Sequence, residues 1–143
     1  MDFSKIYMKD TKIVAVALIK NTEGKYLLVN LANYYKGFDK FHDAWYPPAG
    51  HIKENETVEK CLIREAKEEL SLDIKPTKLI SEWEQDIPGE KAVWWECLPL
   101  SEAIKKSNEI AEVGWFSKEE IKNMELWPTT LKFFKKFIWV RDD

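Results

Sequence analysis

The chain has 143 residues, of which 45% are hydrophobic and 33% are charged, and its formal net charge is −3. This length predicts one domain, residues 1–143, with the residue balance of an ordinary globular protein. A protein that coats a nucleic-acid polymer would be basic, so the negative net charge argues against such a partner, whereas local cations and a metal can still hold a small nucleotide.

The cysteines and the N-terminal sequence predict a cytoplasmic protein without a membrane partner. Cys61 and Cys97 are the only cysteines and form no CxxC pair, so we expect reduced thiols. The first ten residues carry charges of both signs and lack the apolar core of a signal peptide. The longest apolar run, residues 13–19, is too short to cross a bilayer.

The N-terminal part of the chain predicts a hairpin followed by a loop. Residues 13–19 form a β-branched run that is typical of a buried central strand. After a turn at residues 21–24, residues 26–29 are expected to return as the second strand of the hairpin. Residues 32–45 are polar and aromatic, which is consistent with a surface loop holding packed rings or with a substrate-facing loop.

A helix is predicted next. Residues 47–50 read Pro-Pro-Ala-Gly, which ends any preceding element. Thr57 is a candidate N-cap for a helix over residues 58–70, and Glu59 suits its first turn. The apolar positions at helical spacing predict one buried face, formed by Val58, Cys61, Leu62 and Ala66.

Further strands are expected after Pro76. Residues 79–85 and 92–98 predict two strands, with Pro88-Gly89 as the turn between them. Residues 113–116 predict another short strand.

Two short helices are expected near the C-terminus. Residues 117–120, Ser-Lys-Glu-Glu, form a capping-box pattern, and Pro128 suits the first turn of a last helix. The buried face of that last helix is predicted at Leu131, Phe134, Phe137 and Ile138. Strands mixed with interspersed helices predict an α/β sandwich.

The predicted helix over residues 58–70 carries three acids on one face. Glu65, Glu68 and Glu69 lie at positions i, i+3 and i+4. Carboxylates this close repel one another and destabilise a helix unless a cation neutralises them. One interpretation is a solvated, glutamate-rich helix, and the other is a divalent-metal site, for which oxygen ligands suit Mg²⁺ or Mn²⁺ and not zinc.

The spacing of neighbouring residues favours the metal site. Five residues separate Gly50 from Glu56, seven separate Glu56 from Arg64, and the three glutamates follow Arg64. This arrangement resembles the Nudix box, G-x5-E-x7-R-E-U-x-E-E-x-G-U, in which U is an aliphatic residue. The aliphatic positions hold Ala66 and Leu72.

One position departs from the box, and two flanking patterns agree with it. Ser71 stands where the box has a glycine that closes the helix with positive φ, so we expect lower stability but no loss of a metal ligand. Residues 48–50, Pro-Ala-Gly, are similar to the family's entry to the box. Glu109, six residues before Trp115, resembles a downstream E-x5-W pattern that supplies a second glutamate from a distant loop.

The resemblance implies a Nudix-type α/β/α sandwich with a mixed sheet, and a hydrolase that cleaves a nucleoside diphosphate linked to another group. It implies that Mg²⁺, with Mn²⁺ as a substitute, is held by the glutamates and the backbone carbonyl of Ala49. One of these carboxylates, or Glu109, would orient or deprotonate the attacking water. The implied ligands on the helix are Glu65, Glu68 and Glu69.

The remaining box residues have supporting roles in this interpretation. Arg64 would hold the glutamates by charge-assisted hydrogen bonds. Glu56 would pair with Arg64 or Lys60 or support the loop, and it would equally suit an ordinary first-turn acid. Gly50 would permit a tight loop that brings backbone to the metal.

The substrate is less well defined by the sequence. Residues 83–88 and 93–95 are similar to the paired strands of the branch that cleaves nucleoside triphosphates to monophosphate and pyrophosphate, although residues 127–130 lack its base-reading Asn. Pro88-Gly89 is similar to a feature of ADP-ribose hydrolases. A nucleoside triphosphate is therefore the first expectation and ADP-ribose or another nucleotide sugar the second, with a non-catalytic nucleotide sensor as a third possibility.

Aromatic and basic side chains are candidates for contacts with the substrate. Aromatic rings can stack on a base and loop lysines can meet phosphates, but the same residues would equally serve a core, a solvated loop or a homodimer interface. The candidates are Tyr35, Lys36, Trp45, Trp83 and Trp127.

Overall fold

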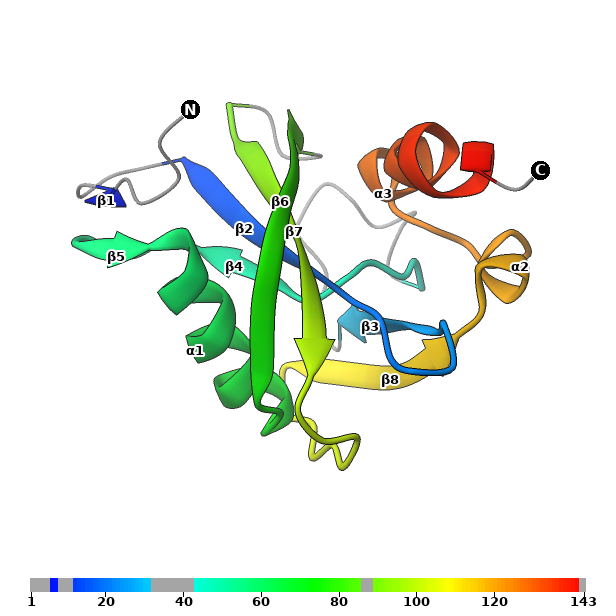
Figure 1. Ribbon diagram of the computed structural model, residues 1–143, viewed down its shortest axis with the longest axis horizontal. Helices are drawn as coiled ribbons and strands as arrows, with labels where there is room; N and C mark the ends of the chain where they lie inside the picture. The colour runs from blue at the N-terminus through cyan, green and yellow to red at the C-terminus, as the bar shows by residue number, and fades with distance from the viewer. Residues whose placement is uncertain (1–5, 8–11, 32–42, 86–88, 142–143) are drawn as a thin grey trace.

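The computed structural model describes residues 6–7, 12–31, 43–85 and 89–141 (Figure 1). The candidates Tyr35 and Lys36, and the predicted turn at Pro88, lie outside these residues. No helix in the described part of the chain is both long enough and apolar enough to cross a membrane.

A mixed sheet of four strands forms the centre of the fold. The β2 and β7 strands are parallel, whereas the β4–β2 and β6–β7 pairs are antiparallel. The long β-branched β2 strand is central because its side chains are buried on both faces. In spatial order the strands are β4 (Ala49–His51), β2 (Ile13–Ile19), β7 (Lys91–Pro99) and β6 (Ile74–Glu84).

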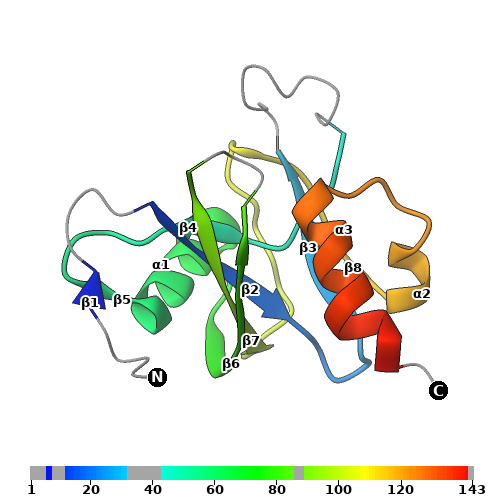
Figure 2. The same cartoon turned by 90° about the horizontal axis from the view of Figure 1, so that it is seen from above.

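Alternating residues of the central strands pack into two separate cores. Ala15 and Ala17 face helix α1 (Val58–Leu70), whereas Val14 and Val16 face the C-terminal helices. This alternation follows from the two-residue period of a strand. Helices therefore cover both faces of the sheet, as Figures 1 and 2 show, and the expected α/β sandwich with a mixed sheet is confirmed.

The C-terminal helices form one continuous helical stretch with three geometries. Pro128 occupies the first turn as predicted, and the buried Phe133, which the sequence pattern missed, stacks on Trp94 with ring centroids 3.7 Å apart. Phe134 is buried, and Leu131, Phe137 and Ile138 pack more loosely against the same core. The stretch comprises α3 (Pro128–Phe133), a π-helix (Phe134–Ile138) and a 3₁₀ turn (Trp139–Arg141).

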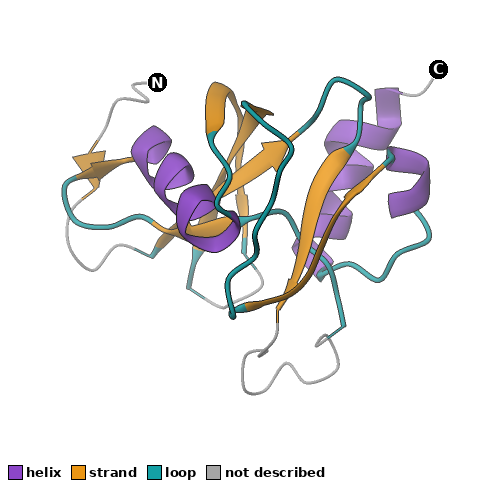
Figure 3. Ribbon diagram, turned by 90° about the horizontal axis from the view of Figure 1, so that it is seen from below, coloured by secondary structure: helices purple, strands orange, loops and turns teal. Residues whose placement is uncertain are grey.

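The predicted hairpin is wrong in its pairing. Strand β3 (Tyr26–Leu31) leaves β2 after the turn and pairs antiparallel with β8 (Ile110–Phe116), forming a second sheet (Figure 3). Only one bridge, Lys20 to Tyr26, joins the β2 and β3 ends in the described residues. The neighbouring position on β2 is instead taken by β7, because the parallel partner continues the buried core on both faces.

Several element boundaries differ from the sequence expectation. Strand β6 begins at Ile74 and contains Pro76, which an edge strand tolerates where the register shifts between Pro76 and Lys78. Strand β8 begins at Ile110 rather than 113. A small pair, β1 (Ile6–Tyr7) and β5 (Glu56–Thr57), was not predicted.

The predicted helix caps are present. Thr57 accepts a hydrogen bond from the backbone of Lys60 at the start of α1. Ser117 and Glu120 form a reciprocal capping box on α2 (Lys118–Ile121). Local side chain to backbone bonding can be predicted from sequence because its partners lie within one turn.

Helix α1 ends at a serine in the left-handed conformation. Ser71 has φ 53° and ψ 31°, and its backbone N–H donates to the carbonyls of Ala66 and Lys67. This is the conformation in which a glycine would avoid the contact between Cβ and carbonyl. The chain therefore keeps the backbone of the box at this position and accepts the strain of a side chain.

Replacing this serine with glycine should stabilise the protein. Ser71→Gly removes the left-handed strain, so we expect the free energy of unfolding to rise by about 1 kcal/mol. Urea unfolding followed by tryptophan fluorescence measures the change. Ser101→Gly is the matched control, since Ser101 is exposed and has no positive φ; it should not stabilise. Equal stability of Ser71→Gly and the wild type would contradict the assignment of strain.

Candidate active site

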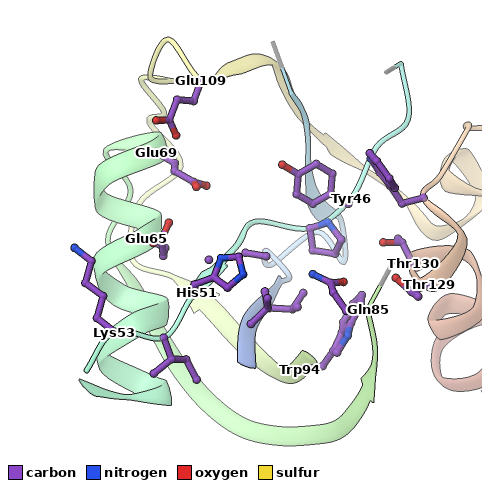
Figure 4. A pocket seen from close by; sticks show the side chains of 17 residues that line it. Tyr46, His51, Lys53, Glu65, Glu69, Gln85, Trp94, Glu109, Thr129 and Thr130 are labelled. Atoms are coloured by element: carbon purple, nitrogen blue, oxygen red, sulfur yellow. The ribbon is translucent and has the colours of Figure 1, made fainter. Parts of the chain in front are cut away.

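A cavity of about 370 Å³ opens between α1, the edge of the four-stranded sheet and the start of α3 (Figure 4). Glu65, Glu69 and Glu109 form one wall (Figure 4), and Ala49 and Gly50 of β4 also line the cavity. The opposite end is lined by rings, hydroxyls and an amide, from Tyr46, Gln85, Trp94, Thr129 and Thr130. Trp127, at the start of α3, also lines the cavity. One end of the cavity is therefore acidic, and the other mixes aromatic and polar groups.

Arg64 holds the acidic wall in place. Its Nε donates to Glu56 Oε2 at 2.6 Å and its Nη2 to Glu56 Oε1 at 2.9 Å, a two-point contact. Its Nη1 donates to Glu65 Oε1 at 2.7 Å, and Nη2 also reaches the His51 carbonyl at 3.2 Å. The hydrogen bond with Arg64 lowers the pKa of Glu56 below its usual value. Of the pairings that the sequence allowed for Glu56, the structure contains the one with Arg64.

Gly50 is required by a close contact and not by an unusual backbone angle. Its φ is not positive, but a Cβ added there would lie 2.5 Å from Glu65 Oε1 and closer still to the Cγ and Cδ atoms. Glu65 therefore lies directly against the backbone of β4. The expectation of a tight loop is replaced by a simpler requirement, which is space for the Glu65 carboxyl group.

A buried thiol on α1 contacts the backbone of strand β4. Cys61 lies on α1 with its Sγ 3.6 Å from the Gly50 carbonyl and 3.5 Å from the His51 carbonyl. Burial raises the pKa of Cys61 to about 12, so the thiol is neutral and not a nucleophile. Both cysteines are free and buried.

Glu69 has the most perturbed environment in the wall. Burial, followed by a hydrogen bond with Glu65 and the charges of Glu65, Glu109 and Glu68, raises the pKa of Glu69 to about 9. A carboxyl group in this position keeps its proton at neutral pH unless a cation takes the proton's place. The wall is therefore a negative cluster that is not compensated by the protein alone.

Glu68 is placed differently from the other two helix acids. Its side chain is 56% exposed and contacts Arg64 Nη1 at 3.3 Å, and it is not among the cavity-lining residues. In the described part of the chain, no three His, Cys, Asp or Glu side chains are close enough to hold an ion by themselves.

The donors present nevertheless fit a hard divalent ion. Mg²⁺ is commonly held by one or two carboxylates, and substrate phosphates and water complete the coordination. The lining carboxylates Glu65, Glu69 and Glu109 offer such oxygens on one wall. The uncompensated charge around Glu69 is the observation that favours a cation there.

The aromatic end contains an unsatisfied donor. Trp94 is 2% exposed, and its Nε1 has no hydrogen-bond partner among the described residues. Thr129 and Thr130 are also buried, at the start of α3. A buried N–H without an acceptor is costly unless a ligand supplies one.

Three aromatic or basic candidates from the sequence are placed by the structure. Trp127 lines the cavity, and its contact with a substrate stays a prediction. Trp45 packs edge-on against Phe116, and Trp83 packs against Phe133 and Phe137; neither is a lining residue. Aromatic composition alone does not distinguish the rings that face a cavity from the rings that fill a core.

Several lining residues were missed by sequence reasoning. The period of β7 places Trp94 on the same face as Val14 and Val16, and that face was not identified in the sequence because only the α1 face carried a motif. Besides Trp94, the structure adds six lining residues with polar groups to the candidates: Tyr46, His51, Lys53, Gln85, Thr129 and Thr130.

Comparison with known families decides the classification. The sequence model described as the NUDIX domain matches residues 10–137, which is most of the chain. The chain belongs to the NUDIX domain family. The glutamate-rich helix and the Arg64–Glu56 pair described above are thus the Nudix box of this protein.

Known proteins support the same fold. A MutT protein from Methanosarcina mazei Go1 superimposes with a TM-score of 0.74 at 24% identity, covering 92% of this chain and 95% of that chain. A NUDIX hydrolase from Nitrosomonas europaea superimposes with a TM-score of 0.78 at 21% identity, covering 96% and 75%.

One curated relative is similar in sequence over a shorter stretch. The NAD-capped RNA hydrolase NudC from Mycobacterium tuberculosis is 29% identical over 76 residues, which is 52% of this chain and 24% of that protein. The match thus spans about a quarter of the relative's length.

A methyl group at Gly50 should displace Glu65. Because the added Cβ overlaps the Glu65 side chain, we expect Gly50→Ala to lower the free energy of unfolding by about 1–3 kcal/mol. It should also abolish the rise in unfolding temperature that we expect Mg²⁺ to produce in the wild type. Gly24→Ala is the control, since Gly24 has positive φ but no atom within 4 Å of the added Cβ; it should keep the Mg²⁺ effect. An undiminished Mg²⁺ effect in Gly50→Ala would contradict this role.

The effect of Mg²⁺ on stability should increase with pH. Unfolding lowers the pKa of Glu69 from about 9 to its usual 4.5, so the folded metal-free protein loses stability as pH rises through this interval. If Mg²⁺ binds the deprotonated carboxylate, its stabilising effect should be larger at pH 9 than at pH 6. Thermal unfolding at both pH values, with and without Mg²⁺, measures this. In Glu69→Gln the dependence should disappear, and a pH-independent Mg²⁺ effect in the wild type would contradict the prediction.

Proposed function

We propose that this Nudix protein is a metal-dependent hydrolase that cleaves the diphosphate linkage of a nucleotide derivative. The observation that carries the proposal is the single cavity with Glu65, Glu69 and Glu109 at one end and the buried Trp94 at the other. A nucleotide has the same polarity, with anionic phosphates at one end and a planar base at the other. The phosphates need their charge neutralised at the acidic end of the cavity. The base needs stacking or hydrogen bonding at the aromatic end.

The acidic wall would hold Mg²⁺, for which Mn²⁺ would substitute. Glu65 and Glu69 would be the carboxylate ligands, and the exposed Glu68 and the carbonyl of Ala49 are the further ligands suggested by the Nudix box. The ion would neutralise the phosphates and acidify a bound water.

The chain's own residues would do the remaining work. Arg64 fixes the Glu65 carboxyl through a 2.7 Å bond, so this group cannot turn away from the cavity. Glu109 approaches from the segment before β8 and shares the wall with Glu69 (Figure 4). The carboxylate of Glu69 or of Glu109 would accept the proton of the attacking water.

The aromatic end would bind the base. Trp94 offers a buried N–H, and Thr129 and Thr130 offer hydroxyl groups where the triphosphate-cleaving branch has its base-reading Asn. Threonine can donate or accept, so this end does not require one particular base. A nucleoside triphosphate, cleaved to monophosphate and pyrophosphate, is the first substrate we propose. The alternatives are ADP-ribose, other nucleotide sugars and nicotinamide dinucleotides. The last of these are included because of the similarity to an NAD-capped RNA hydrolase.

A substrate panel tests the proposal most directly. The protein is incubated with Mg²⁺ and nucleoside triphosphates, ADP-ribose, nucleotide sugars or NADH, and the products are separated by ion-exchange chromatography. Release of pyrophosphate from a triphosphate would support the first substrate, and release of two monophosphates from ADP-ribose would support the second. Binding to the panel without any turnover would overturn the enzyme in favour of a nucleotide sensor.

Removing one charge from the wall should stop turnover. We expect Glu69→Gln to lower kcat by at least about a hundredfold, because the amide neither binds the cation nor accepts a proton. Its unfolding temperature without metal should be close to that of the wild type, since the wild-type carboxyl is itself protonated at neutral pH. Glu59→Gln is the matched control, because Glu59 lies on the exposed face of the same helix. Wild-type turnover by Glu69→Gln would reject the assigned site.

The domain organisation, location and partners of the protein are predictions from the sequence. A single domain over residues 1–143, a cytoplasmic location, the absence of a nucleic-acid polymer as partner and a homodimer are all expectations. Size-exclusion chromatography with light scattering would decide the last of them.

A further inference from the structure

His51 faces the cavity because of its position in the sheet. It lies directly opposite Val14 across the antiparallel β4–β2 pair, and paired side chains project from the same face. Val14 lines the cavity, and so does His51. In Figure 4 the His51 ring lies between Glu65 on α1 and the Trp94 and Gln85 side chains at the other end.

The His51 ring is held by the carboxylate of Glu90, the residue that precedes strand β7. Its Nε2 lies 2.6 Å from Glu90 Oε2, although 39 residues separate the two in sequence. The Glu90 side chain is only 10% exposed, whereas that of His51 is 53% exposed. The carboxylate is therefore a buried support, and the ring is the accessible part of the pair.

This pair is not explained by stability alone. Glu90 Oε1 is buried and has no hydrogen-bond partner among the described residues. Burying a carboxylate with one oxygen unsatisfied is unfavourable, and an exposed histidine is a weak partner for compensating it. The His51–Glu90 contact would be kept despite this cost if the His51 ring needed a fixed orientation in the cavity.

The charge of the cavity explains why a fixed histidine would be useful there. A phosphate chain running from the acidic wall toward Trp94 would meet the negative charges of Glu65, Glu69 and Glu109. Among the described residues that line the cavity, the basic side chains are His51 and Lys53. Both side chains are exposed, and the contact with Glu90 fixes the His51 ring at a defined point between the two ends.

We propose that His51 contacts the phosphates of the substrate and that Glu90 is the residue that positions the His51 ring. Glu90 holds the ring through the contact at Nε2, and the ring presents its other nitrogen, Nδ1, to a non-bridging phosphate oxygen. The proposal rests on the proposed function, since it names a further contact of the same substrate. It assigns this contact to the phosphates and not to the base or the sugar.

Histidine NMR tests the contact without turnover. The chain has two histidines, so its ring signals can be assigned with one His51→Gln variant. In the presence of Mg²⁺, methylenediphosphonate should shift the His51 ring signals, whereas adenosine should not. Mg²⁺ alone provides the baseline. An unchanged His51 signal with saturating methylenediphosphonate, or a shift with adenosine only, would overturn the proposal.

Kinetics at one fixed pH test the pair as a unit. With the best substrate of the panel, His51→Gln should raise KM roughly tenfold, as expected for one charge-assisted hydrogen bond, with a smaller effect on kcat. Glu90→Gln should raise KM less, and the double variant should be no worse than His51→Gln alone, because Glu90 acts through His51. Asp73→Asn, which breaks the exposed Lys67–Asp73 pair away from the cavity, is the control and should change neither constant.

The outcomes separate this proposal from the proposed function. Wild-type KM in His51→Gln together with normal turnover would overturn the His51 contact and leave the hydrolase in place. Additive effects of the two substitutions would overturn the role of Glu90. A His51 shift with methylenediphosphonate in a protein that hydrolyses nothing in the panel would support the phosphate contact and reject the hydrolase. Thermal unfolding of each variant ensures that only folded protein is compared.

Discussion

The contact between Arg64 and Glu56 is the constraint on which the site depends. Its two short hydrogen bonds, 2.6 and 2.9 Å, join the middle of α1 to the segment that leads into the helix. The same guanidinium also binds Glu65 and the carbonyl of His51, so it links the helix, its acidic face and strand β4. Without this link, mutual repulsion would favour separation of the carboxylates that form the wall of the cavity.

The edge position of β4 explains how residues from opposite faces of the sheet meet in one cavity. Gly50 faces α1, where the absence of a side chain makes room for Glu65. The next residue, His51, faces the other way, toward the core that contains Trp94. Because no strand lies beyond β4 in the described sheet, the cavity passes around its edge and joins both faces. The acidic end thus belongs to one layer of the sandwich, and the aromatic end belongs to the other.

Local features were predictable because their causes are local. The Thr57 cap, the Ser117 capping box and the start of the last helix at Pro128 all depend on atoms within one helical turn. The pairing of β3 was not predictable in this way. A tight turn after β2 suggested a hairpin, but burial of β2 on both faces favoured the distant β7 as its neighbour. Long-range pairing depends on packing energies that a short sequence window does not contain.

The sequence by itself determined the family and the acidic end of the site, since the Nudix box lies within 23 consecutive residues whose spacing follows from one loop and one helix. Only the tertiary structure decided which other residues share the cavity. Trp94, His51 and Thr130 come from separate elements, and Trp83 and Trp45, which look equally suitable in sequence, pack into the core. The physical reason is that a strand or helix presents a residue to one face only, and what lies at that face depends on the elements packed against it.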